Sequence, residues 1–169
     1  MTVTLRPATA DDLMGVGALH QESRVAAYSS FLPTEALADP TPEAMGRYWT
    51  ERWRWERDTH RLTVVERDGT LVGFSHLGPD DEDDPDTGLL NAIHLDPAEQ
   101  GRGIGRMLML DALDAMRARG WQRAVLWVLR DNAHALKFYR RGGWTPTGDE
   151  RDEAIGAAPT RQLRYTRPL

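Results

Sequence analysis

A glycine-rich hexapeptide, Gln100-Gly101-Arg102-Gly103-Ile104-Gly105, constrains the fold of this chain more than any other segment. It joins an apolar stretch at 89–95, typical of a strand, to residues 103–119, where apolar side chains recur at helical spacing. Glycines at such a junction let backbone N–H groups turn toward a ligand, and the first N–H groups of a helix have no partner within it. Because the helix dipole also favours an anion at this end, the segment predicts a phosphate or diphosphate site.

Spacing separates the kinds of nucleotide site that such a loop could form. A P-loop needs Gly-Lys-Ser/Thr at its end, whereas Arg106-Met107 follows Gly105 here. A dinucleotide fingerprint needs a small residue where Leu108 stands and should open the first βαβ unit of the chain. The pattern that remains is Gln/Arg-x-x-Gly-x-Gly/Ala, which Gln100, Gly103 and Gly105 match.

Hydrophobic periodicity predicts strands and helices in alternation along the rest of the chain. Strands are expected at residues 3–6, 62–66, 71–74, 89–95, 124–129, 144–147 and 162–166, and helices from Thr9, over 103–119 and over 132–141, with two short helices between residues 24 and 60. Asp12 completes a capping-box-like start with Thr9, and Asn132 can cap the last helix. A chain of 169 residues suits one domain, so residues 1–169 are expected to form a single unit.

A second motif follows the loop by one strand. Asn132, Ala135, Phe138 and Tyr139 fit the pattern Asn-x-x-Ala-x-x-Phe-Tyr, and Gly143-Trp144 comes after it. Asn132 and Tyr139 are seven residues apart, two helical turns, and so share one face. With both motifs in register, the sequence resembles the GCN5-related N-acetyltransferase (GNAT) superfamily, clearly over residues 60–165.

The resemblance implies a fold and a cofactor. The fold would be α/β (mixed α+β), with a central, mostly antiparallel sheet of six to seven strands, a splayed parallel strand pair and about four flanking helices. The cofactor would be acetyl-CoA or coenzyme A, its pyrophosphate held by the loop. The residues expected to contact it are Ile93, Leu95, Gln100, Gly101, Arg102, Gly103, Ile104, Gly105, Arg106, Asn132 and Tyr139.

Individual roles within that set also follow from the resemblance. A backbone N–H between Ile93 and Leu95, exposed where the strands splay, would polarise the acetyl carbonyl. Asn132 would contact the pantetheine arm or the chain near it. Tyr139 would give its proton to the departing thiolate, although a tyrosine on an amphipathic helix is equally suited to a core.

The general base is not evident. An attacking amine must be neutral, and many relatives carry a glutamate near the start of the strand before the loop, where this chain has Leu89. The candidates to replace it are Glu66, His76, His94 and a water chain. His94 adjoins the expected acetyl site and a histidine titrates near 6.5, but strand alternation leaves open whether its side chain faces the substrate.

The amino-terminal helices and the loops facing the splayed strands are expected to form the acceptor pocket. The candidate lining residues are Tyr28, Phe31, Trp49 and Tyr165. Aromatic residues at helical spacing also suit a core, and Arg164-Tyr165 could contact either the acceptor or the second subunit of a homodimer. The acidic run at 80–84 could steer a cationic amine or form the solvated tip of a hairpin.

Composition narrows the functional classes. A net charge of -5 argues against nucleic-acid binding and suits a cationic small substrate. No apolar run approaches the roughly 20 residues of a membrane span, and the start of the chain lacks a secretory signal, so a cytoplasmic location is expected. Cysteine is absent and the five histidines lack metal-ligand spacing, so no metal site is expected.

The first functional hypothesis is an enzyme, an N-acetyltransferase. It would move an acetyl group from acetyl-CoA to a primary amine of a small molecule or amino acid, by direct attack in a ternary complex. The alternatives are acetylation of a protein amino-terminus or lysine, which needs an open groove, and a non-catalytic acyl-CoA-binding regulatory module, which the missing glutamate favours.

Overall fold

The chain forms seven strands and five α-helices, and the computed structural model describes all of residues 1–169. In chain order the elements are β1 (Val3–Pro7), α1 (Leu13–Tyr28), α2 (Thr34–Leu37), α3 (Pro42–Glu56), β2 (Arg61–Arg67), β3 (Thr70–Pro79), β4 (Thr87–Leu95), α4 (Ile104–Ala118), β5 (Arg123–Leu129), α5 (Ala133–Arg141), β6 (Thr145–Ile155) and β7 (Ala158–Pro168), with short 3-10 turns η1 (Ala10–Asp12) and η2 (Pro97–Glu99). No helix combines the length and apolarity that crossing a bilayer requires.

All seven strands belong to one sheet in the order β1-β2-β3-β4-β5-β7-β6. Every neighbouring pair is antiparallel except β4 and β5, which are parallel. This architecture confirms the expected mixed fold with a mostly antiparallel sheet and one parallel pair. Five helices flank it, one more than the number expected.

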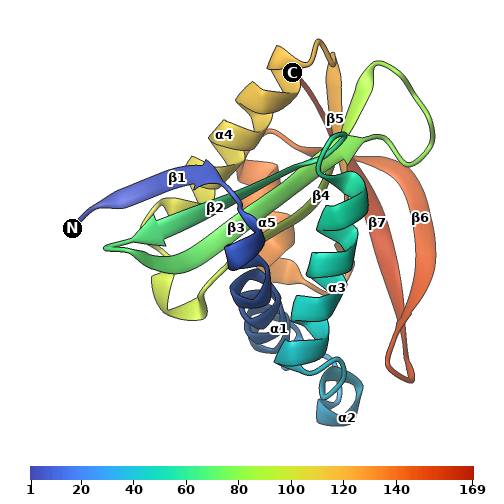
Figure 1. Cartoon of the computed structure of the whole chain (residues 1–169). Coiled ribbons are helices and arrows are strands. Elements are labelled where there is room, and N and C mark those ends of the chain that lie inside the picture. The colour runs from blue at the N-terminus through green and yellow to red at the C-terminus, as the bar shows by residue number, and fades with distance from the viewer.

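The helices cover both faces of the sheet (Figure 1). On one face, α1 and α3 pack Leu13, Val16 and Trp49 against the sheet residues Val64 and Phe74. On the other face, α4 buries an apolar stripe against β4, β5 and β7, and α5 packs beside it. The residues of α4 in this second core are Met109, Ala112, Leu113 and Met116. The sheet therefore separates two cores, and a ligand can pass between them only where the sheet opens.

That opening lies between β4 and β5. The two strands pair only from Thr87 to Leu89, opposite Arg123 to Val125. Beyond these three positions β4 continues to Leu95 beside β3, and β5 continues to Leu129 beside β7, without pairing to each other. A bulge interrupts the pairing of β3 with β4, since His76 and Leu77 lie opposite Ala92 and Leu90 and leave Asn91 unpaired. A bulge bends the strand that carries it, which suits a strand that turns away from its neighbour.

The structure corrects several expected boundaries. The segment from 24 to 60 holds the end of α1, a single turn in α2 and the 15-residue α3, rather than two short helices. The strand expected to begin at 71–74 does so within one residue and continues as the ten-residue β3. The expected short strands at 144–147 and 162–166 are β6 and β7, eleven residues each. Nearly every residue of β6 is exposed, so it has no hydrophobic alternation from which to predict a strand.

Helices α1 and α3 approach each other most closely at Gly17 and Gly46. A Cβ atom added to Gly17 would lie 2.2 Å from the backbone nitrogen of Gly46, a distance that no side-chain movement can relieve. Gly15, two residues earlier in the same helix, has no atom within 4 Å of its would-be Cβ. The close crossing of α1 and α3 therefore requires glycine at position 17 of α1, whereas position 15 has room for a side chain.

We expect Gly17→Ala to lower the free energy of unfolding by about 3 kcal/mol, because the backbones must separate to admit the methyl group. Gly15→Ala is the matched control and should raise it by about 0.5–1 kcal/mol through helix propensity alone. Urea denaturation of the three proteins measures both values. Equal effects of the two substitutions would contradict the packing described for this crossing.

Candidate active site

The glycine-rich loop follows β4 and η2 and leads directly into α4. Gly101 and Gly103 have φ values of 79° and 82°, a left-handed conformation that residues with a Cβ rarely adopt. Gly103 is the residue at the N-cap of α4, so the second of these turns starts the helix. Open space surrounds both glycines, which shows that their role is backbone conformation rather than close packing.

This loop carries a continuous row of free hydrogen-bond donors. The backbone N–H groups from Gly101 to Arg106 donate to no acceptor in the protein, and the first intrahelical bond runs from the Met107 N–H to the Gly103 carbonyl. The positive end of the helix dipole lies at the same point, and Arg102 and Arg106 add charge. The arrangement suits an anion with several acceptor oxygens, such as a diphosphate.

A buried ion pair fixes the start of the loop. Glu99, 4% exposed, lies at the end of η2 and pairs with the guanidinium of Arg67 on β2. The Glu99 N–H also donates to the Asp96 carbonyl at 2.8 Å. The donor row is therefore attached to the sheet by a charge pair that leaves the donors themselves unoccupied.

The opening between β4 and β5 exposes specific backbone groups of β4. The Asp96 N–H donates to the Val72 carbonyl at 2.8 Å, so it points toward β3. Because N–H directions alternate along a strand, the N–H groups of Ile93 and Leu95 point the other way, into the opening. Both lie between the glycine-rich loop and the bulge at Asn91, where a carbonyl oxygen could accept from them.

Helix α5 brings Asn132 and Tyr139 to the same region. Asn132 is the N-cap residue, and its Oδ1 accepts from the Ala135 N–H at 3.2 Å, which leaves its amide NH₂ free to donate. The Tyr139 ring packs against the core beneath α4 and near Trp144. Burial raises the pKa of Tyr139 well above its usual value, and the nearby Tyr28 raises it further. The hydroxyl is therefore a proton donor at neutral pH and cannot act as a base.

Tyr139 belongs to the core on the α4 and α5 face, whereas Tyr28 ends α1 on the opposite face of the sheet.

Leu89 stands where relatives carry the glutamate. Two of the residues proposed to replace that glutamate, Glu66 and His76, are engaged in other contacts. Leu89 is buried between Gly78 of β3 and Val125 of β5. The carboxylate of Glu66 accepts from Arg6 at 2.6 Å, which occupies it in an ion pair. The side chain of His76 stacks on His60, with Nε2 3.4 Å from Glu56.

His94 points toward α1. Its Nδ1 lies 3.0 Å from Ser23 Oγ, and its ring stacks on Phe74 and lies 4.3 Å, centroid to centroid, from the ring of His20. Burial lowers the pKa of His94 well below its usual value, so the imidazole is neutral and weakly basic. This answers the question left open by strand alternation: the side chain of His94 packs under α1 and does not line either of the two cavities described below.

A cavity of about 380 Å³ lies on the α1 side, at the open end of the splayed strands. Its lining residues are His20, Arg24 and Tyr28 of α1, Asp39 and Pro40, Leu129 at the end of β5, Glu153, Ala154 and Ile155 of β6, Gly156, and Gln162 of β7. The β6–β7 turn touches α2, since a Cβ on Gly156 would lie 2.9 Å from Ala36. The cavity is thus bridged by this contact. It lies where the sequence led us to expect the acceptor, between the amino-terminal helices and the splayed strands, so we call it the acceptor cavity.

The expected acceptor residues fall into two groups. Tyr28 lines the acceptor cavity, and Phe31 packs its ring against Tyr28 at 5.6 Å. Trp49 is wrong as an acceptor-cavity residue: it is 1% exposed, and it lines instead a separate hollow of about 370 Å³ beside His60 and His76. Its indole is part of the core because α3 turns that face toward the sheet.

Tyr165 is also wrong, and for a similar reason. It is buried in the core on the α4 face, and its hydroxyl accepts from Arg140 at 3.1 Å. A side chain in this position reaches neither the acceptor cavity nor the surface of a second subunit.

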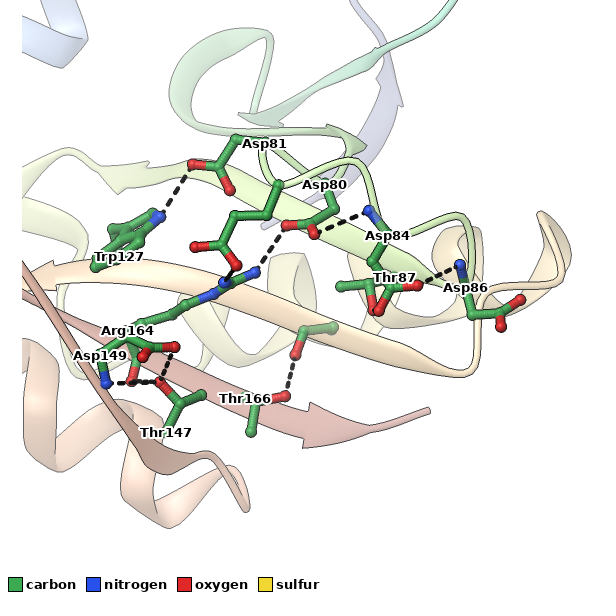
Figure 2. Close-up of polar contacts among 12 residues, drawn as sticks. Asp80, Asp81, Asp84, Asp86, Thr87, Trp127, Thr147, Asp149, Arg164 and Thr166 are labelled. Atoms are coloured by element: carbon green, nitrogen blue, oxygen red, sulfur yellow. Dashed lines mark hydrogen bonds and ion pairs between the residues drawn. The ribbon is translucent and has the colours of Figure 1, made fainter.

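The acidic run is only partly a solvated tip, because residues 81–84 are exposed whereas Asp80 is buried. Figure 2 shows Asp80 and Arg164 facing each other. Their ion pair measures 2.8 Å, and both side chains are buried. Arg164 also pairs with Glu82, and the Trp127 indole donates to Asp81 at 3.1 Å. The loop is therefore bound to β5 and β7, which neutralises much of the charge that was expected to steer an amine.

Several residues of the acceptor cavity were not anticipated from the sequence. Arg24 and His20 lie on α1 beside Tyr28, at helical spacing that could have indicated a shared face. Glu153 and Gln162 lie on the long β6–β7 hairpin, whose charged sequence carries no strand pattern. Asp39 lies in the irregular segment after α2, for which the sequence offers no signal.

Comparison with known sequences agrees with this geometry. Mycothiol acetyltransferase of Beutenbergia cavernae is 46% identical over 85 residues, which are 50% of this chain and 28% of that protein. Mycothiol acetyltransferase of Nocardia farcinica is 34% identical over 120 residues, 66% of this chain and 39% of that protein. The chain thus spans well under half the length of these relatives.

Solved structures establish the same fold across the whole chain. The PaiA N-acetyltransferase of Thermoplasma acidophilum, solved in complex with coenzyme A, has a TM-score of 0.82 at 19% identity and covers 100% of both chains. Ribosomal-protein-alanine N-acetyltransferase of Brucella melitensis has a TM-score of 0.73 at 23% identity and covers 98% of this chain and 99% of that one.

A model of a protein family also matches this sequence. The model described as "Acetyltransferase (GNAT) family" matches residues 26–144, which include β4, the glycine-rich loop, α4 and α5. This match takes in more than half of the chain and both motifs. The chain belongs to the GNAT family of acetyltransferases.

Proposed function

We propose that this chain transfers an acetyl group from acetyl-CoA to a primary amine of a small molecule or amino acid. The observation that carries the proposal is the row of six free backbone N–H groups from Gly101 to Arg106, placed beside an opening that joins both faces of the sheet. One ligand can bind at the row and extend into the opening, and a second can reach it from the acceptor cavity.

The residues present fit an acyl-CoA. The loop and the side chains of Arg102 and Arg106 would bind the diphosphate, and the free NH₂ of Asn132 would donate to the pantetheine arm. The Ile93 and Leu95 N–H groups face the region that an acyl carbonyl would occupy. When bound, acyl-CoA would supply an acyl carbon that is activated as a thioester.

The chemistry is a direct displacement in a ternary complex. The amine nitrogen forms a bond to the acyl carbon, the carbon–sulfur bond breaks, and the nitrogen loses a proton. The N–H donors at Ile93 and Leu95 would stabilise the oxygen while it carries negative charge. Holding both reactants at the opening would supply much of the rate acceleration, because the entropic cost of bringing them together is met on binding.

Tyr139 would stabilise the departing sulfur. A thiol has a pKa near 8.5, whereas burial holds the pKa of Tyr139 above the ordinary tyrosine value. Complete transfer of the Tyr139 proton to the thiolate is therefore unfavourable in free energy. Its hydroxyl therefore acts by donating a hydrogen bond to the sulfur. The proton that finally neutralises the thiolate comes from the attacking nitrogen, directly or through that hydroxyl.

A small acceptor fits this site better than a protein segment. The contact of Gly156 with α2 bridges the acceptor cavity, and an extended peptide would need an open groove there. The volume of about 380 Å³ lies near the lower end of the range for small-molecule sites.

The cofactor assignment predicts that Gly103→Ala weakens coenzyme A binding at least tenfold, because a Cβ at φ 82° distorts the donor row. Gly120→Ala is the matched control: it has φ 83° at the other end of α4, and open space surrounds both positions. Both variants should lose similar stability. Only Gly103→Ala should lose the shift in thermal midpoint that coenzyme A produces, and an undiminished shift would contradict the loop as the binding site.

Transfer itself is tested by free-thiol release from acetyl-CoA with a panel of primary amines. We expect turnover with at least one small amine, and Tyr139→Phe should lower kcat about tenfold to a hundredfold while coenzyme A still raises the thermal midpoint. Tyr48→Phe, at an exposed position on α3, is the control. Saturable coenzyme A binding without turnover of any amine would instead indicate a binding module.

The pH profile follows from the titrating groups. Burial lowers the pKa of His20 to about 4 and that of His94 well below its usual value, whereas Tyr139 is raised. None of these groups changes charge between pH 6 and 8, so the acceptor amine limits the rate. We expect kcat/KM to rise about tenfold per pH unit until the amine's own pKa, about 8 to 10.4. A plateau above pH 7 would instead reveal a histidine base.

A further inference from the structure

The acceptor cavity contains a cation without an ion-pair partner. Arg24, on α1, lines the cavity, and no carboxylate lies within 4.0 Å of its guanidinium. Asp39, which lines the same cavity, contacts Arg24 through its backbone carbonyl at 3.4 Å rather than through its side chain. The positive charge of Arg24 is therefore available to a ligand in this cavity.

The guanidinium is held in place by neutral groups. Its Nη1 donates to Gln21 Oε1 at 3.2 Å and to the Asp39 carbonyl at 3.4 Å. Gln21 is 5% exposed, and its Nε2 donates to the Leu37 carbonyl at 2.8 Å, so it cannot turn away. These contacts orient Arg24 and leave its Nη2 and Nε donors free.

Two further features favour an anion beside Arg24. Burial lowers the pKa of Arg24, which means that the charged form has lost part of its hydration and would gain from an anionic partner. His20 lines the same cavity and receives a hydrogen bond at Nδ1 from the Trp49 indole at 3.0 Å. Because burial keeps His20 neutral, its proton lies on Nε2, which is a second donor.

The position of Arg24 relates this anion site to the reacting atoms. Arg24 and Tyr28 are four residues apart on α1 and therefore neighbours on one face of the helix. The same cavity includes Leu129, at the end of β5 that has parted from β4. On the facing wall, Glu153 of β6 offers a carboxylate that suits an ammonium group. The cavity thus has a cation on one wall and the carboxylate of Glu153 on the other, with Asp39 beside Arg24.

From this arrangement we infer that the acceptor carries a carboxylate as well as its amine, and that Arg24 is the residue that selects it. The inference rests on the proposed acetyl transfer and narrows its substrate class to amino acids and related amino carboxylates. A bidentate contact from the free Nη2 and Nε donors would bind the carboxylate and leave the amine to approach the opening between β4 and β5. A protein amino-terminus, which has no free carboxylate beside its amine, would lack this contact.

The test compares matched acceptors that differ only in the carboxylate. Thiol release from acetyl-CoA is measured with free amino acids and with their primary amides, and the acid-to-amide ratio of kcat/KM is recorded. The wild-type chain should favour the acids by about tenfold to a hundredfold, the effect of a charge-assisted hydrogen bond. Arg24→Gln should bring this ratio close to one, through a higher KM for the acids.

A control and a charge reversal sharpen the result. Arg54→Gln, at an exposed position on α3 outside the cavity, should leave the ratio at the wild-type value. Arg24→Glu should invert the preference, so that aliphatic diamines become better acceptors than amino acids. Retention of the coenzyme A midpoint shift in both Arg24 variants shows that they are folded.

The possible outcomes separate the two proposals. An equal kcat/KM for amides and acids with the wild-type chain, or an acid preference that survives Arg24→Gln, overturns the role of Arg24 and leaves acetyl transfer standing. Absence of turnover with every amine, acid or amide, overturns acetyl transfer and the inference with it.

Discussion

The parting of β4 from β5 after three paired positions is the constraint on which the rest of the site depends. Each strand is held along its remaining length by another neighbour, β4 by β3 and β5 by β7, so neither can close the opening. The unpaired Asn91 adds a bend at the point of divergence. As a result, the backbone N–H groups of Ile93 and Leu95, which a continuous sheet would pair with a neighbouring strand, stay free.

Burial then determines which groups near the opening carry charge. Desolvation keeps His20 and His94 neutral and Tyr139 protonated, so the side chains nearest the reaction supply hydrogen bonds rather than bases. Fixed backbone dipoles and the positioning of two ligands consequently have a larger role than proton transfer. A leucine at position 89 is compatible with such a site, because an acceptor amine that arrives neutral needs no carboxylate there.

The sequence predicted those parts of the site, the glycine-rich loop and the start of α5, whose geometry depends only on residues close together in the chain. Gly101 and Gly103 need only their own backbone and the following helix, and Asn132 caps α5 within three residues, so spacing alone identified them. The acceptor cavity depends on contacts between distant segments. Trp49 and Tyr165 look alike in sequence to Tyr28, and only the packing of α3 and β7 determines that they are core residues.

The place of β7 in the sheet has a consequence for how the chain is made. This strand follows both β5 and β6 in sequence, yet it lies between them in the sheet. During synthesis, the edge of β5 that carries Val125, Leu126 and Val128 therefore lacks this neighbour until β7 has left the ribosome. Arg164 arrives with that segment, so Asp80 also remains without its partner until then. Chains that lack β7 should for this reason be prone to edge-to-edge association through β5.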